Sequence, residues 1–238
     1  ANACVVALAT QTITEPTLLS ASVSKTDVSC NGASTGSISI TTPAGGVAPY
    51  EFSVNGGTYQ SSGSFTGLAA GTYTLAIRDA NSCVVALATQ TITEPTLLSA
   101  SVSKTDVMCN GASTGSISIT TPTGGVAPYE FSVNGGAYQS SGSFTGLVAG
   151  TYTLAIRDAN ACVVALATQT ITEPTLLSAS VSKTDVLCNG ASTGAISITS
   201  PVGGVAPYEY SVNGGAYQSS GSFTGLAAGT YTLSIRDA

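Results

Sequence analysis

The segment LAAGTYTLAIRDANSCVVAL, residues 68–87, decides the fold. In its first half Tyr73, Leu75 and Ile77 alternate with small or polar residues, which is the period of a β-strand with one buried face. Residues 79–82 are turn formers, and a second β-rich run follows them. The segment therefore predicts a β-hairpin.

The hairpin recurs because the chain of 238 residues repeats one unit. The cysteines form two sets with a spacing of 79 residues within each set, Cys4, Cys83, Cys162 and Cys30, Cys109, Cys188. A unit of this length suits a small domain with its own core. Glu-Pro dipeptides between β-rich runs mark the boundaries, because proline cannot donate to a sheet. We expect a final strand of a preceding or partner domain in residues 1–15, domains at 16–94 and 95–173, and a domain lacking its last strand at 174–238.

Composition excludes several classes of function. Six Lys and Arg residues and a net charge of −6 provide no basic patch, so we expect no nucleic-acid partner and no binding to an anionic membrane. No apolar run approaches the length of a membrane span, and the first residues do not resemble a signal peptide. We expect no membrane insertion in this segment.

Short β-patterned runs separated by turn signals predict an all-β fold of tandem immunoglobulin-like β-sandwiches in a linear array. The spacing from Leu68 through Gly71 to Tyr73 matches a tyrosine corner, in which the hydroxyl closes a turn onto upstream backbone. The corner tyrosines are expected to be Tyr73, Tyr152 and Tyr231. Strand parity also predicts an irregularity near Thr89 to Ile92, because Val85 and Ile92 cannot otherwise share a face.

Four ordered motifs carry a family resemblance. They are CNGxSxGSI at 30–38, GGxxPY at 45–50, GLxxGTY at 67–73 and DANxC at 79–83. Together they resemble the SprB repeat of Bacteroidota surface proteins, which include a gliding-motility adhesin. The resemblance implies an extracellular or cell-surface adhesin or filament built from immunoglobulin-like modules, with neighbouring copies of itself as partners. It implies no catalytic residues and no cofactor.

The even number of cysteines suggests disulfides in an exported protein. Pairing inside one repeat, Cys30 with Cys83 and Cys109 with Cys162, would stabilise each domain by about 4 kcal/mol. In a sandwich of this strand order, however, Cys30 and Cys83 lie at opposite ends, roughly 30 Å apart for ten-residue strands. We slightly prefer a bridge from Cys30 to Cys162 between neighbouring repeats, and the pairing within one repeat stays open if the first strand is short.

Two other motifs of the chain point only weakly to a chemical function. The GASTG motif at 32–36 matches a hydrolase nucleophile elbow, but the chain has no histidine to act as a base and no helix pattern after the motif, so we expect no enzyme. Asp79 and Asn81 could offer oxygen ligands to Ca²⁺, although a cation of this kind needs six to eight of them. A solvated, hydrogen-bonded turn is the preferred interpretation.

We therefore expect a structural and adhesive repeat region that forms a stiff rod. A possible surface glycan or solid substrate would be its external partner. The alternative function is a carbohydrate- or ice-binding repeat that uses threonine-rich strand faces. Its candidate residues are Thr10, Thr12, Thr14, Thr89, Thr91 and Thr93.

The first and last residues of the sequence raise one further hypothesis. Residues 4–15 repeat the last strand of a domain, and residues 174–238 omit that strand. The sequence is then either an excerpt of a longer array, which we favour, or a subunit that polymerises head to tail, its spare strand completing the open sheet of the next chain.

Overall fold

The structure, a computed structural model, describes residues 2–238 and consists of β-strands joined by loops. These residues divide into two compact units, each described separately below. The first unit holds the described residues up to Leu98 together with the loops Gly124–Ala127 and Asp158–Cys162. The second holds Ser99–Thr123, Pro128–Arg157 and Val163–Ala238. No helix long and apolar enough to cross a membrane occurs in the described part of the chain.

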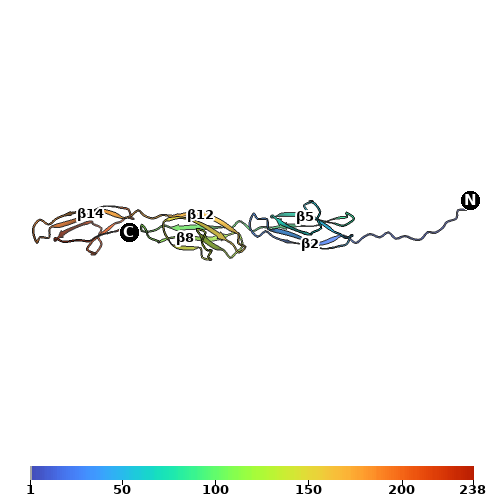
Figure 1. The fold of residues 1–238 in the computed structure, drawn as a ribbon, viewed down its shortest axis with the longest axis horizontal. Helices are drawn as coiled ribbons and strands as arrows, with labels where there is room; N and C mark the ends of the chain where they lie inside the picture. Colours follow the sequence, from blue (N-terminus) through green and yellow to red (C-terminus); the bar gives the residue numbers. More distant parts are fainter. Residues whose placement is uncertain (1) are drawn as a thin grey trace. The chain divides into compact units, whose positions relative to one another are not determined.

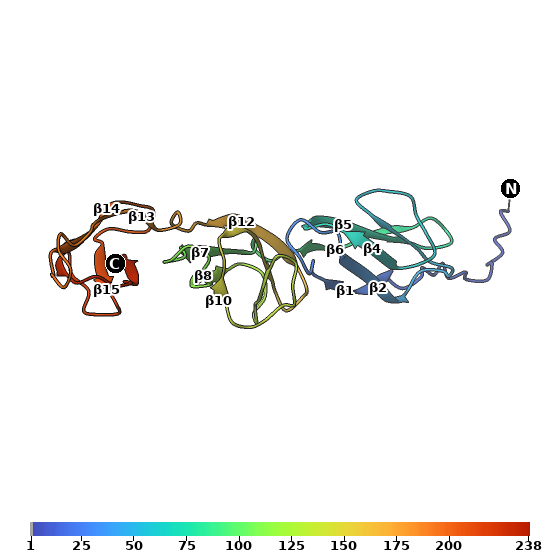
Figure 2. The same cartoon turned by 60° about the vertical axis from the view of Figure 1, so that its left-hand side comes forward.

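The first repeat, residues 16–94, forms a sandwich of two antiparallel sheets. Its strands are β1 (Ser20–Thr26), β2 (Gly36–Ala44), β3 (Glu51–Val54), β4 (Ser64–Leu68), β5 (Gly71–Arg78) and β6 (Val84–Ile92). One sheet has the order β1-β2-β4 and the other the order β3-β5-β6. Figure 1 labels one strand of each sheet, β2 and β5, and Figure 2 gives a second view of the sandwich. The inner faces pack on each other, which confirms the immunoglobulin-like all-β fold.

Alternating side chains build the core of this sandwich. Ile38 on β2 and Ile77 on β5 are fully buried, and Phe52, Leu75 and Ile92 pack with them. The two-residue period of the sequence therefore places one face of each strand inside, as a half-buried antiparallel sheet requires.

The hairpin of residues 68–87 is confirmed as β5 and β6. Tyr73 pairs with Gln90, but Leu75 pairs with Leu87, so two residues of β6 lie opposite one residue of β5. This β-bulge lies at residues 88–89 and allows both Leu87 and Ile92 to point inward. The irregularity that strand parity required is confirmed, at the start of its predicted range.

The segment after β3 crosses from one sheet to the other. The Asn55-Gly56 turn has left-handed backbone, with φ of 50° and 67°, and Gln60 then forms a single bridge with Phe52. β4 pairs with β2 in the opposite sheet. The crossing brings Gly63 so close to the carbonyl oxygen of Ile40 that a Cβ atom at Gly63 would overlap it.

The second repeat, residues 95–173, has the same strand order. Its strands are β7 (Ser99–Thr105), β8 (Gly115–Thr123), β9 (Glu130–Val133), β10 (Ser143–Leu147), β11 (Gly150–Arg157) and β12 (Val163–Ile171). They form the sheets β10-β8-β7 and β12-β11-β9.

The third repeat, residues 174–238, contains β13 (Ser178–Thr184), β14 (Gly194–Val202), β15 (Glu209–Val212), β16 (Ser222–Leu226) and β17 (Leu233–Arg236). Its second sheet holds only β15 and β17. β17 is half as long as β5. In the first repeat Gly71, Thr72 and Tyr73 pair with β6 and not with β3, and their counterparts in the third repeat have no strand equivalent to β6 beside them. The third repeat is therefore a sandwich with one open edge.

Residues 2–18 are exposed and include no strand (Figure 1). Their apolar side chains are among the most exposed in the chain, and Ile13 is 98% exposed. Its counterpart in the first repeat, Ile92, is 1% exposed. The same residue type at the same repeat position therefore occurs here in two opposite environments.

Candidate functional site

The loop between β5 and β6 is organised by Asp79. This carboxylate is 4% exposed and accepts the N–H groups of Val47, Asn81 and Cys83 at 2.9–3.0 Å. Burial of the carboxyl opposes ionisation, but the N–H groups of Cys83, Val47 and Asn81 outweigh it and lower the pKa of Asp79 below its ordinary value of 3.8. Asp79 thus holds the turn that presents Cys83.

Because of these contacts, few oxygen ligands remain for a cation in this turn. The oxygens of Asp79 bind backbone N–H groups, and Asn81 contributes its backbone N–H to the carboxylate. Within residues 2–238 no group of three or more His, Cys, Asp or Glu side chains could hold a metal ion. We therefore propose no role for Ca²⁺ at Asp79 and Asn81.

A second loop presents the other kind of cysteine. Cys30 follows β1, and its carbonyl accepts the N–H of Ala33. Glu94, of the Glu-Pro dipeptide, accepts the N–H of Gly32 at 2.6 Å, and Asn31 donates to the carbonyl of Pro95 at 3.0 Å. The loop that contains Cys30 is therefore hydrogen-bonded to the Glu-Pro dipeptide that joins the two repeats. Glu173 and Pro174 make the same contacts with Asn110 and Gly111.

Cys30 and Cys162 form a disulfide, with Cα atoms 5.6 Å apart. Cys162 lies in the loop between β11 and β12, where Asp158 accepts the N–H groups of Asn160 and Cys162 as Asp79 does in the first repeat. The Asn160 side chain also donates to the carbonyl of Ser29 at 3.0 Å. A polar contact therefore lies beside the covalent bond.

The pairings within one repeat do not form, since Cys83 and Cys109 are free and exposed, as are Cys4 and Cys188. Asp79, in the turn before Cys83, accepts the N–H of Val47, and the neighbouring Gly46 donates to the carbonyl of Thr17, which precedes β1. Cys83 therefore lies near the start of β1, whereas Cys30 follows its end. Seven residues of β1 span roughly 23 Å, far beyond the 7 Å that a disulfide allows.

The three corner tyrosines make equivalent hydrogen bonds. Tyr73 donates to the carbonyl of Ala69 at 2.9 Å, and Tyr152 donates to the carbonyl of Val148 at 2.9 Å. Tyr231 donates to the carbonyl of Ala227 at 2.8 Å, so the corner persists in the third repeat. Each hydroxyl thus closes the turn before the strand that carries it.

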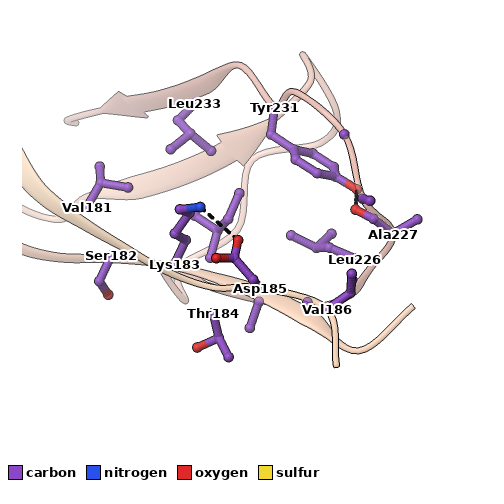
Figure 3. A pocket seen from close by; sticks show the side chains of 15 residues that line it. Val181, Ser182, Lys183, Thr184, Asp185, Val186, Leu226, Ala227, Tyr231 and Leu233 are labelled. Carbon is purple, nitrogen blue, oxygen red and sulfur yellow. Dashed lines mark hydrogen bonds and ion pairs between the residues drawn. The ribbon is translucent and has the colours of Figure 1, made fainter. Parts of the chain in front are cut away.

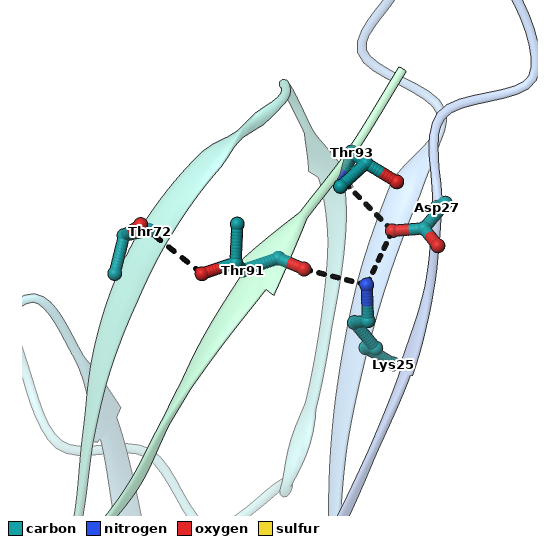
Figure 4. Close-up of polar contacts among 5 residues, drawn as sticks. All are labelled: Lys25, Asp27, Thr72, Thr91 and Thr93. Atoms are coloured by element: carbon teal, nitrogen blue, oxygen red, sulfur yellow. Dashed lines mark hydrogen bonds and ion pairs between the residues drawn. The ribbon is translucent and has the colours of Figure 1, made fainter. Parts of the chain in front are cut away.

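A polar clamp, consisting of Lys25, Asp27 and the residues they hold on the last strand, was not found from the sequence (Figure 4). Lys25 binds Asp27 at 2.7 Å and donates to the carbonyl of Thr91, while Asp27 accepts the N–H of Thr93 at 2.7 Å. The Lys25 ammonium and then the Thr93 N–H lower the pKa of Asp27 below 3.8. The Lys-Thr-Asp sequence after a β-rich run is the feature from which the clamp could have been predicted.

The clamp is repeated in the second repeat by Lys104 and Asp106, with the carbonyl of Thr170 and the N–H of Thr172 as its partners. In the third repeat Lys183 and Asp185 still pair at 2.7 Å but hold no strand. Their side chains are 71% and 78% exposed, against 32% and 47% for Lys25 and Asp27. The third clamp is thus open.

A groove of about 380 Å³ runs along this open edge (Figure 3). Apolar side chains of β13, β14, β16, β17 and the adjoining loops line it, including Val181, Val186, Ile196, Leu226, Tyr231 and Leu233. In the first repeat the corresponding space holds Ile92, whose Cγ2 lies 2.9 Å from where a Cβ on Gly36 would be. At Gly194 the three nearest atoms to such a Cβ belong instead to Leu226, Thr184 and Val186. The groove therefore lies at the position that the Ile92 end of β6 occupies in the first repeat.

The threonines of β6 do not form a regular ladder. Thr91 faces Thr72, with their hydroxyl oxygens 3.2 Å apart, but Thr89 lies in the bulge. Thr93 follows the strand and is held through its N–H by Asp27. A flat array of evenly spaced hydroxyls, as an ice-binding face needs, is therefore not built here.

The fold defines a class of protein: tandem immunoglobulin-like repeats, in which one pair of cysteine loops is joined by the Cys30–Cys162 disulfide. The SprB repeat family matches the chain three times, at residues 22–59, 101–138 and 180–217. Each match covers the first three strands of a repeat and stops before the hairpin. No curated protein matches the sequence significantly.

Three solved structures have a low similarity to this chain. A C-terminal fragment of intimin, in complex with the intimin-binding domain of its translocated receptor, is 13% identical, with 70% of this chain and 67% of that one covered and a TM-score of 0.32. Three N-terminal domains of the bacteriophage RB49 outer capsid protein Hoc are 11% identical, with 92% and 80% covered and a TM-score of 0.40. A tetra-tandem repeat from the extending region of a large adhesion protein is 19% identical, with 92% and 64% covered and a TM-score of 0.25.

Proposed function

We propose that the chain is a non-catalytic structural and adhesive repeat region of a bacterial surface adhesin or extracellular filament. Its domains are bounded by the Glu-Pro joints, at 16–94, 95–173 and 174–238. Three matches to the SprB repeat in one chain support this function. A Bacteroidota origin and a link to gliding motility are part of the proposal. A disulfide between exposed loops supports an extracellular location, because such bonds persist in oxidising compartments.

The observation that carries the proposal is the Cys30–Cys162 disulfide beside the Glu94 joint. A short linker would normally let two domains swing, since interfaces of this kind are small. A covalent bond between loops of successive repeats removes most of that freedom. The repeats then act as a stiff rod that displays its outer surface at a distance from the cell.

The mechanical part of this function is tested by small-angle X-ray scattering of the oxidised chain and of a Cys30→Ser, Cys162→Ser variant. A stiff rod gives a narrow distribution of maximum dimensions, which broadens in the variant. A Cys83→Ser variant serves as the control because Cys83 is free. Identical distributions in all three proteins would contradict the stiffening role.

The adhesive part is tested by retention of the purified chain on polysaccharide-coated and bare solid surfaces. Retention on one class of surface identifies the external partner. Loss of the chain from every surface at the rate of an inert protein would remove the adhesive role and leave the structural one. Head-to-tail assembly with other copies of the chain also belongs to the proposed function.

A further inference from the structure

We propose that the adhesive surface of the first repeat is the outer face of its β1-β2-β4 sheet, that the equivalent sheets serve the other repeats, and that the partner is a neutral polysaccharide. The inference rests on the adhesive part of the proposed function and names its surface and the chemical class of its partner. We call this surface the hydroxyl face. In the first repeat it consists of Ser22, Ser24, Thr26, Ser37, Ser39, Thr41, Ser64 and Thr66.

The hydroxyl face is a regular array because its residues lie opposite one another on three strands. Ser39 of β2 pairs with Ser24 of β1 and with Ser64 of β4. The rows on either side of it consist of Thr26, Ser37 and Thr66 and of Ser22 and Thr41. Neighbouring strands are about 4.8 Å apart, and side chains on one face of a strand repeat every ~6.8 Å. The hydroxyls therefore form a grid.

The hydroxyls point away from the core and are available to a partner. Ile38 and Ile40, on either side of Ser39, are 0% and 3% exposed, so the alternate side chains of β2 point outward. The hydroxyl of Ser22 accepts that of Thr42 at 2.9 Å. The other hydroxyls of the face make no hydrogen bond to any residue that the structure describes.

The hydroxyl face carries no charge. The charged side chains of the first repeat hold β6, join β3 to β5, and fix the loop after β5 and the Glu-Pro joint, through Lys25, Asp27, Glu51, Arg78, Asp79 and Glu94. Although Lys25 lies between Ser24 and Thr26, its ammonium donates to the Thr91 carbonyl of the opposite sheet. An ionic partner would therefore find no opposing charge on this surface.

The outer face of the β3-β5-β6 sheet is built differently. Arg78 binds Glu51 there and lies 4.3 Å from the centre of the Tyr59 ring. Val84 and Ala86 are exposed on β6. The same repeat thus places charged, aromatic and apolar side chains on one sheet and gathers hydroxyls on the other. The hydroxyl face is a property of one sheet and not of the composition as a whole.

The chemistry of the array selects its partner. A serine or threonine hydroxyl both donates and accepts hydrogen bonds, as the hydroxyls of a sugar do. An apolar partner would leave these groups without hydrogen bonds and is disfavoured. Short side chains lose little rotamer freedom on binding, and they do not block the approach of an extended chain. A neutral polysaccharide meets all of these requirements.

The second repeat has the same array. Its residues are Ser101, Ser103, Thr105, Ser116, Ser118, Thr120, Ser143 and Thr145. The third repeat keeps the rows around Ser197 and has Ala195 at the position of Ser37. Several weak sites on one chain can hold a long polymer much more tightly than one site does.

The test measures depletion of the 238-residue chain from solution by insoluble polysaccharides. Cellulose, starch and agarose are the neutral probes, and calcium alginate is the anionic one. We expect binding to at least one neutral polysaccharide and weaker binding to alginate. Because no ion pair is involved, added NaCl should change the affinity for the neutral polysaccharide by less than about twofold.

The first variant adds one charge to the centre of each hydroxyl face. It carries Ser39→Lys, Ser118→Lys and Ser197→Lys, and it should bind the neutral polysaccharide at least ~10-fold more weakly, because each ammonium would be desolvated without a partner. The matched control adds the same charge at exposed positions on or beside the other sheet. It carries Thr74→Lys, Thr153→Lys and Thr232→Lys and should bind as the natural chain does.

A second variant keeps the face neutral and protects the test against misfolding. It carries Ser39→Ala, Ser118→Ala and Ser197→Ala, and it should bind about two- to tenfold more weakly for each hydrogen bond lost. Circular dichroism checks that all variants are folded.

Two results would overturn the inference: equal binding of the natural chain and of both face variants, or no binding to any neutral polysaccharide. In either case retention on another class of surface would leave the adhesive function standing. Failure of the natural chain to be retained on any surface would contradict the inference and the adhesive function together.

Discussion

Gly36 and Ile92 meet across the two sheets of the first repeat, with Ile92 Cγ2 2.9 Å from the position of a Cβ atom on Gly36. Gly36→Ala should therefore destabilise the first repeat by about 1–3 kcal/mol, since the added methyl would also crowd the Leu68 carbonyl. Amide hydrogen exchange of peptides from residues 16–94 measures the loss. Ser37→Ala, at the next position, is the control, and equal protection in the two variants would refute the packing argument.

The Cys30–Cys162 bond closes a loop with a sequence separation of 132 residues, and this loop cannot be extended while the bond is intact. When the chain is pulled from its ends, reduction of this bond should lengthen the fully unfolded chain by roughly 450 Å, at the reach of an extended chain. Single-molecule force spectroscopy with and without reductant measures the difference. Cys83→Ser should leave the gain unchanged, and a gain of zero would mean that the bond is absent in solution.

Asp27 makes the stability of the first repeat depend on pH. Its pKa is lowered in the folded state, so its contribution is present at neutral pH and is lost as the pH falls below 3.8 through the folded-state pKa. Asp27→Asn should lower the urea midpoint at pH 7, and its deficit relative to the natural chain should shrink towards pH 3.

The control for this pH dependence is Asp185→Asn in the dilute, reduced chain, because Asp185 pairs with Lys183 but holds no strand. Its effect at pH 7 should be smaller than that of Asp27→Asn. A deficit for Asp27→Asn that stays constant from pH 7 to pH 3 would show that the carboxylate charge is not its cause.

The tyrosine corner predicts a cost for losing one hydroxyl. Tyr152→Phe removes the hydrogen bond to the Val148 carbonyl and should lower the free energy of unfolding by about 0.5–1.5 kcal/mol. Tyr59→Phe is the control, since Tyr59 contacts Arg78 through its ring. Urea denaturation curves give both values, and a Tyr59→Phe change as costly as Tyr152→Phe would argue against the corner.

The open edge predicts uneven protection of equivalent amides. Residues 229–232 should exchange hydrogen faster than residues 71–74, which pair with β6. Addition of a synthetic peptide of residues 84–92, the sequence of β6, should slow exchange at 229–232 and leave 71–74 unchanged. Exchange that is equally slow in both segments before any addition would mean that the edge is already covered.

Much of the fold was predictable because it depends on local patterns. The alternation around Tyr73, Leu75 and Ile77 predicted the hairpin, and parity alone required the bulge that the structure has at residues 88–89. Contacts across the sandwich were not predictable in the same way. Lys25 and Thr91 are 66 residues apart, and no local pattern shows that one binds the carbonyl of the other.

The sequence by itself determined the repeat, the strand faces and the turns, because a period of 79 residues, an alternation of two and residues such as Asn55-Gly56 act over short distances along the chain. Only the tertiary structure decided which cysteines meet, that β4 crosses to the sheet of β2, and that β17 shortens without a neighbour. These outcomes depend on which strand ends lie together and which backbone groups have partners, and both are fixed only when the sheets pack.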